Sequence, residues 1–83
     1  MALIIPPHVV AQFAAMPRGD ARRLRDKLGR IADDPSGPQP GVKAMAGTPG
    51  MFRVRQGDWR AIYVIKDGNV IVGRVGNRKE VYR

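Results

Sequence analysis

The pattern of apolar and polar residues predicts one strand and two helices in the first 33 residues. Residues 2–5 are apolar and end at two prolines, as a short strand would. Pro7 suits the first turn of a helix, and apolar residues then recur at helical spacing until Pro17 ends that helix at or near Met16. A second helix is expected over Arg18–Asp33, because one apolar stripe runs along it. The stripe consists of Ala21, Leu24, Leu28, Ile31 and Ala32.

Residues 34–50 are predicted to form a loop. This stretch holds four prolines and four glycines, which oppose long regular structure. It is not expected to be a linker between two domains, because neither flank is large enough to fold alone.

The last third of the chain predicts a meander of three β-strands, Met51–Arg55, Trp59–Lys66 and Asn69–Val75. The middle strand is apolar on both faces, which favours a central position, with Trp59 and Tyr63 as core aromatics on one face. Asp67-Gly68 is a strong hairpin signal. Gly76 and Asn77 are expected to break the third strand and leave residues 78–83 as a tail.

These elements predict a single small α+β domain over residues 1–83, in the order β-α-α-β-β-β. A helical hairpin would pack on one face of a mainly antiparallel sheet. The chain has 83 residues, which leaves room for one domain.

Composition excludes several classes of site. The chain has no cysteine, so we expect no disulfide and no Cys-ligated metal centre. His8 is the one histidine, and we expect it to be a surface or capping residue. No metal and no cofactor are therefore expected. Residues 1–5 lack the pattern of a signal peptide, and no apolar run is long enough for a membrane span, so the expected location is the cytoplasm.

Positive charge dominates and is unevenly distributed. The net charge is +8, and residues 43–83 hold nine Lys or Arg residues against three acidic ones. Most of these cations are arginines, whose planar fork suits phosphate. Such a balance indicates a polyanionic partner. The basic residues of the second predicted helix are expected to be a solvated face that could also contact RNA backbone.

Four arginines and a tyrosine form the strongest candidate site. Arg53 and Arg55 lie two apart on one strand and should project from the same face. Arg60 would lie across a tight turn from Arg55, while Arg78 and Tyr82 follow the third strand. Like charges opposite each other destabilise a sheet, so this cluster is expected to bind phosphates, with Tyr82 available to stack on a base.

These residues resemble the RelE family of bacterial type II toxins, and the likeness covers nearly the whole chain. The combination of a GD-aromatic-R-x-I-Y segment and a terminal VG-x-R…EVYR segment is fairly specific. The stretches that carry the resemblance are residues 42–47, 52–55, 57–63, 67–68 and 75–83.

The resemblance implies a ribosome-dependent mRNA endoribonuclease that cuts in the A site by 2′-hydroxyl attack on the adjacent phosphate. It implies that Arg53 and Arg55 act at the phosphate and in proton transfer, and that Arg60 contacts the scissile phosphate. Arg78 would support the transition state or the leaving group, and Tyr82 would stack on a base or assist proton transfer. It also implies two partners, an antitoxin that is usually acidic and the ribosome with its mRNA, and neither a membrane nor a small-molecule substrate.

The proton acceptor stays unassigned at this point. The best-known members of that family carry lysines where this chain has Arg53 and Arg55, and arginine does not release its proton. Glu80 and Tyr82 are the nearest alternatives in sequence. Two other functions stay open: a non-catalytic ParE-like toxin that inhibits DNA gyrase, and a plain basic RNA-binding module.

Overall fold

The computed structural model describes residues 2–34, 41–79 and 81, which form two helices and five strands. The helices are α1 (Pro7–Ala14) and α2 (Arg18–Asp33). The strands are β1 (Ala2–Ile4), β2 (Val42–Ala44), β3 (Met51–Gln56), β4 (Trp59–Lys66) and β5 (Asn69–Asn77). Within the described residues, no helix is long and apolar enough to cross a membrane.

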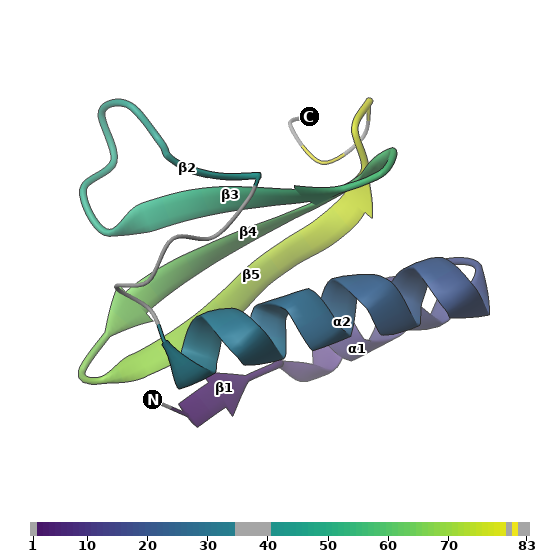
Figure 1. The fold of residues 1–83 in the computed structure, drawn as a ribbon, viewed down its shortest axis with the longest axis horizontal. Coiled ribbons are helices and arrows are strands. Elements are labelled where there is room, and N and C mark those ends of the chain that lie inside the picture. The colour runs from purple at the N-terminus through teal and green to yellow at the C-terminus, as the bar shows by residue number, and fades with distance from the viewer. Residues whose placement is uncertain (1, 35–40, 80, 82–83) are drawn as a thin grey trace.

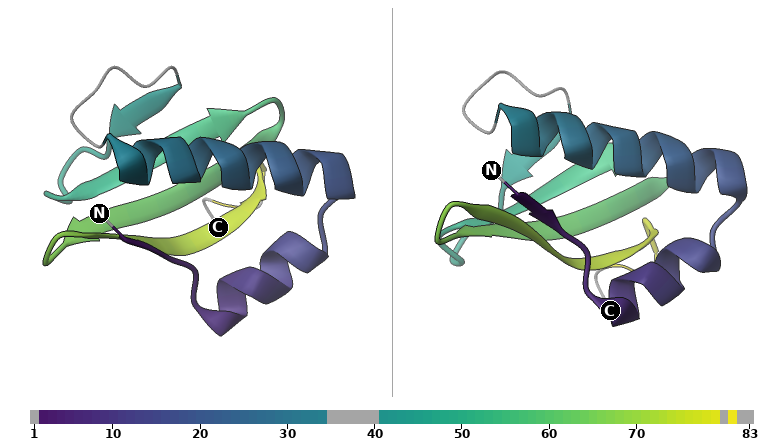
Figure 2. Two further views of the ribbon diagram at one scale, coloured as in Figure 1. Left: turned by 60° about the horizontal axis from the view of Figure 1, so that its bottom comes forward. Right: turned by 90° about the horizontal axis from the view of Figure 1, so that it is seen from below.

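The strands form one sheet in the order β1-β5-β4-β3-β2. Strand β1 runs parallel to β5, and the other three pairs are antiparallel. Both helices lie on the same side of this sheet (Figures 1 and 2). No helix of the described residues lies on the other face, which we call the uncovered face. The predicted α+β architecture, with a helical hairpin on one face of a mainly antiparallel sheet, is confirmed.

Two details of the sequence prediction are wrong. The expected loop over residues 34–50 contains β2, whose three residues pair with Phe52, Arg53 and Val54 of β3. Gly76 and Asn77 do not break β5, because they pair with Arg60 and Trp59 on the central strand β4. In both places a neighbouring strand supplies hydrogen bonds that override local propensity.

The core lies between the apolar stripe of α2 and the covered face of the sheet. Leu24 and Leu28 are fully buried, as are Val54 and Ala61 on β3 and β4. Tyr63 is 2% exposed and its ring stacks on Phe52, with 5.4 Å between the ring centroids. Trp59 packs against the edge of this core. His8 is exposed, and its Nε2 lies 2.9 Å from the Gly73 carbonyl oxygen, so it is a surface residue.

Burial gives Tyr63 a distinctive titration. Desolvation raises the pKa of its phenol above the ordinary value of 10.0. The unfolded chain therefore releases this proton first, so the stability that Tyr63 contributes is present below pH 10 and falls as the pH rises further. In Tyr82→Phe, Tyr63 is the only tyrosine left, and we expect its tyrosinate absorbance to appear with a midpoint above pH 10. A midpoint at 10 in the folded protein would contradict the burial argument.

Candidate functional site on the open face of the sheet

Strand register places five basic side chains on the uncovered face. Arg53 and Arg55 of β3 are exposed, while Val54 between them is buried under α2. Arg55 pairs with Arg60, and Arg53 pairs with Lys43 on one side and Ile62 on the other. Residues that pair directly share a face, so Lys43 and Arg60 lie with the two arginines. Ile62 in turn pairs with Arg74, which adds a cation from β5.

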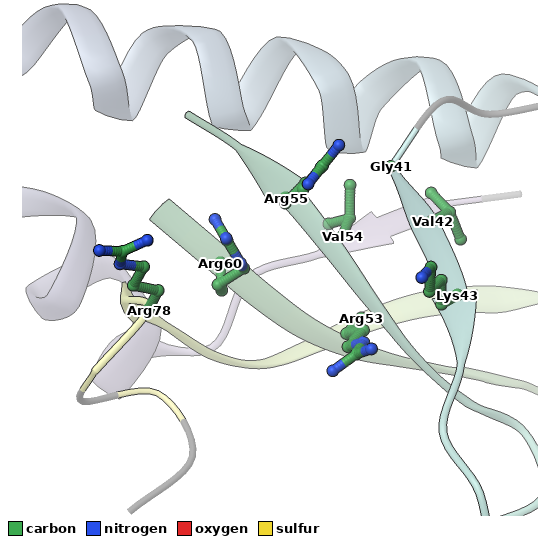
Figure 3. A pocket seen from close by; sticks show the side chains of 8 residues that line it. All are labelled: Gly41, Val42, Lys43, Arg53, Val54, Arg55, Arg60 and Arg78. Atoms are coloured by element: carbon green, nitrogen blue, oxygen red, sulfur yellow. The ribbon is translucent and has the colours of Figure 1, made fainter. Parts of the chain in front are cut away.

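A cavity of about 390 Å³ lies at one end of this face (Figure 3). Its charged lining residues are Lys43, Arg53, Arg55, Arg60 and Arg78. The four arginines singled out in the sequence therefore surround one cavity. Tyr82 and Glu80 lie outside the described residues. The described lining residues include no carboxylate, so an anion is the natural occupant.

Lys43 is the lining cation that the sequence analysis did not place. Its position opposite Arg53 depends on β2, and the proline- and glycine-rich context of β2 predicts a loop. The one available signal was weak: Lys43 stands between Val42 and Ala44 in a short alternating stretch.

The β3–β4 turn positions Arg60 and Arg78. The Arg60 guanidinium Nη1 donates hydrogen bonds to the carbonyl oxygens of Gly57 (2.7 Å) and Trp59 (3.0 Å). The backbone N–H of Arg78 donates to the carbonyl of Asp58 at 2.9 Å. Both arginines are thus tied to residues 57–59 at the β3–β4 turn, although Arg60 belongs to β4 and Arg78 follows β5.

The segment after β5 is fixed by Asn77 and Val81. The Asn77 side-chain oxygen accepts from the N–H of Lys79 at 2.8 Å, and its carbonyl accepts from the N–H of Val81 at 3.0 Å. Val81 is 1% exposed, so it anchors the chain three residues after Arg78. Arg78 is therefore held at the cavity on both sides.

Gly41 lines this cavity and lies against Arg55. Its φ is +80°, and an added Cβ would lie 3.1 Å from Arg55 Cγ and 3.2 Å from the Arg55 carbonyl oxygen. We expect Gly41→Ala to lower the free energy of unfolding by about 2 kcal/mol, through backbone strain plus crowding.

Gly47→Ala is the matched control for Gly41→Ala. Gly47 has a similar φ of +77° but nothing within 4 Å of an added Cβ, so strain alone should cost about 1 kcal/mol. Urea denaturation measures both losses. Equal losses would show that the contact with Arg55 contributes nothing.

Residues 5–82 match the family described as ParE toxin of type II toxin-antitoxin system, parDE. The chain belongs to this family. The protein is therefore a toxin of a type II toxin–antitoxin system in the RelE/ParE superfamily, and the likeness found in the sequence is confirmed. A search of the curated proteins gave no match.

Solved structures agree with the toxin's fold. RelE in the RelB-RelE antitoxin-toxin complex from Methanococcus jannaschii superposes with a TM-score of 0.79 at 18% identity, over 95% of this chain and 94% of that one. The isolated E. coli RelE toxin superposes with a TM-score of 0.78 at 21% sequence identity, over 98% of this chain and 89% of that one. The archaeal RelE-RelB complex from Pyrococcus horikoshii OT3 has a TM-score of 0.78 at 23% sequence identity, over 95% of this chain and 96% of that one. At these identities the likeness establishes a common fold.

Proposed function

We propose that this toxin is a ribosome-dependent mRNA endoribonuclease that cuts the codon in the A site. The observation that supports this most strongly is the cavity lined by Arg53, Arg55, Arg60 and Arg78. Such preorganised cations stabilise the extra negative charge of a pentacoordinate phosphate. The ribosome would supply the orientation of the mRNA, which explains how a domain of 83 residues can suffice. This activity places the toxin in the cytoplasm.

The proposed reaction is a transesterification within the RNA. The 2′-oxygen forms a bond to phosphorus while the bond from phosphorus to the 5′-oxygen breaks. The 2′-hydroxyl loses one proton and the departing 5′-oxygen gains one, so no co-reactant is consumed. The products are a 2′,3′-cyclic phosphate end and a 5′-hydroxyl end. Arg60 contacts the scissile phosphate, Arg78 supports the leaving group, and Tyr82 stacks on a base.

Lys43 is the described lining residue that can exchange a proton, because arginine side chains stay protonated. We expect Lys43→Arg to slow A-site cleavage by about 100-fold although it preserves the charge. Lys43→Met should be at least as slow. Single-turnover cleavage of mRNA on programmed ribosomes measures both. A Lys43→Arg toxin with the full rate would show that Lys43 acts through its charge alone.

A cognate antitoxin is the second partner we propose. The solved complexes from M. jannaschii and P. horikoshii each pair RelE with RelB. A partner of this toxin would be acidic, because the toxin carries a net charge of +8. It would cover the arginine-lined cavity and so block access to RNA.

Inhibition of DNA gyrase is the competing function, and the family match itself favours it, since that family is described by ParE and parDE. Two assays on the purified toxin decide between them. Ribosomes programmed with mRNA and an empty A site test cleavage by primer extension, and gyrase supercoiling tests the alternative. We expect a cut within the A-site codon and unimpaired supercoiling. Intact mRNA with inhibited gyrase would reject the nuclease, and RNA binding without either effect would indicate a plain binding module.

A further inference from the structure

Lys27 lies where α2 passes over the end of β3. Its Nζ donates a hydrogen bond to the Arg55 carbonyl oxygen at 3.0 Å. The backbone N–H of Arg55 donates to the Gly41 carbonyl at 3.2 Å. The Arg55 backbone is therefore held on one side by the helix and on the other by the segment that enters β2.

The side chain of Arg55 lines the cavity and also lies close to Lys27 and Gly41. Strand register assigns Arg55 to the same face as Arg53, but at this end of β3 the two side chains diverge: in Figure 3 Arg55 extends towards α2 beside Gly41, whereas Arg53 extends away from the helix. An added Cβ on Gly41 would be 3.1 Å from Arg55 Cγ and 3.3 Å from Lys27 Nζ, so the two cationic side chains border the same glycine. Arg30 follows Lys27 by three residues on α2, so the two side chains are neighbours on the helix surface. We call this place, formed by Lys27, Arg30 and Arg55, the α2–β3 seam.

The seam concentrates positive charge at the cavity rim. Partial burial lowers the pKa of Lys27 below its ordinary value of 10.5, and repulsion by Arg30 and Arg55 lowers it further. An ammonium carries three N–H donors, and among the described residues one of them is used by the Arg55 carbonyl. A bound anion would accept from the others and would relieve the repulsion among the three cations.

We propose that the anion site continues from the cavity into the α2–β3 seam, where Lys27, Arg30 and Arg55 bind a second phosphate of the same RNA strand. This inference rests on the proposed function, because it needs an RNA strand whose reacting phosphate occupies the cavity. The seam phosphate does not react. Its contacts are independent of base sequence, and they add affinity for the strand equally before and during the reaction.

Oligonucleotides with different numbers of phosphates test the seam. The probes are a 2′-O-methyl dinucleotide with one phosphodiester and a 2′-O-methyl tetranucleotide with three, neither of which can be cleaved. We expect Lys27→Met, which keeps the aliphatic stem, to weaken tetranucleotide binding about tenfold and to leave dinucleotide binding unchanged. The salt dependence of tetranucleotide binding should fall by about 0.7 in log–log slope, the value for one lost phosphate contact on a single strand. Lys27→Arg should restore binding.

Arg23→Ala is the matched control. Arg23 lies on the same helix and its removal changes the net charge equally, but its Nη2 is paired with Asp20 at 2.8 Å. We expect it to bind both probes as the wild type does. Urea denaturation of each variant verifies that the fold is intact. On programmed ribosomes, Lys27→Met should raise KM and leave kcat unchanged.

Three results would overturn the proposal that the seam binds a second RNA phosphate. Lys27→Met could bind the tetranucleotide normally, or it could lose both probes equally, which would make Lys27 a support for Arg55 alone. It could instead weaken binding of a hexaglutamate peptide while RNA binding stays normal, which would assign the seam to a protein partner. In each case A-site cleavage by the wild-type toxin would still stand. Absence of that cleavage is the separate result that rejects the proposed function.

Discussion

Arg60→Ala and Arg78→Ala should each slow cleavage of A-site mRNA by about 100-fold to 1000-fold. Removal of one preorganised donor to a transition-state oxyanion has an effect of this size in other enzymes. Both residues line the cavity and are tied to the β3–β4 turn through Gly57, Asp58 and Trp59. Single-turnover cleavage on programmed ribosomes, with the unfolding free energy of each variant measured alongside, gives the result.

Arg74→Ala is the control for this prediction. Arg74 shares the uncovered face of the sheet, opposite Ile62, but it is not among the residues that line the cavity. Its removal changes the net charge by the same amount, and we expect the cleavage rate to stay within about threefold of the wild type. If Arg60→Ala and Arg74→Ala slowed cleavage equally, the overall charge of the sheet, and not the cavity, would carry the effect.

Leu28→Ala should lower the free energy of unfolding by about 3 kcal/mol. Leu28 is fully buried between α2 and the sheet, and truncation there removes apolar contacts and leaves a cavity. A domain of this size has a small margin of stability, so this loss is a large fraction of the whole. Urea denaturation followed by circular dichroism measures it.

Val10→Ala is the matched truncation outside the core. Val10 lies on α1 and is 51% exposed, so its loss should cost no more than about 0.5 kcal/mol. A cost at Leu28 as small as that at Val10 would mean that α2 does not pack on the sheet as described.

The sequence predicted the helices well because their signals are local. The apolar stripe of α2, Pro7 at the start of α1 and Pro17 beyond its end are all local features, and α2 spans Arg18–Asp33 as predicted. Strand β2 could not be predicted in the same way. Its three residues form a strand because they pair with β3, and the residues next to them in the sequence carry no signal of that pairing.

The candidate site shows the same division between local and distant information. Alternation on one strand placed Arg53 and Arg55 on one face, and the turn placed Arg60 beside them. Lys43 and Lys27 depend on contacts across 10 and 28 positions with Arg53 and Arg55, which the pattern of a single segment does not encode. The catalytic roles of the arginines, and that of Tyr82, remain predictions.

A single 2′-deoxy substitution in the A-site codon tests the central claim most directly. The account predicts that wild-type toxin cuts ribosome-bound mRNA within that codon, as mapped by primer extension. It also predicts that replacing the ribose 2′-hydroxyl at the cut position with hydrogen abolishes the cut, because the attacking oxygen is gone. A cut that persists at the deoxy position, or an all-RNA codon that stays intact, would contradict it.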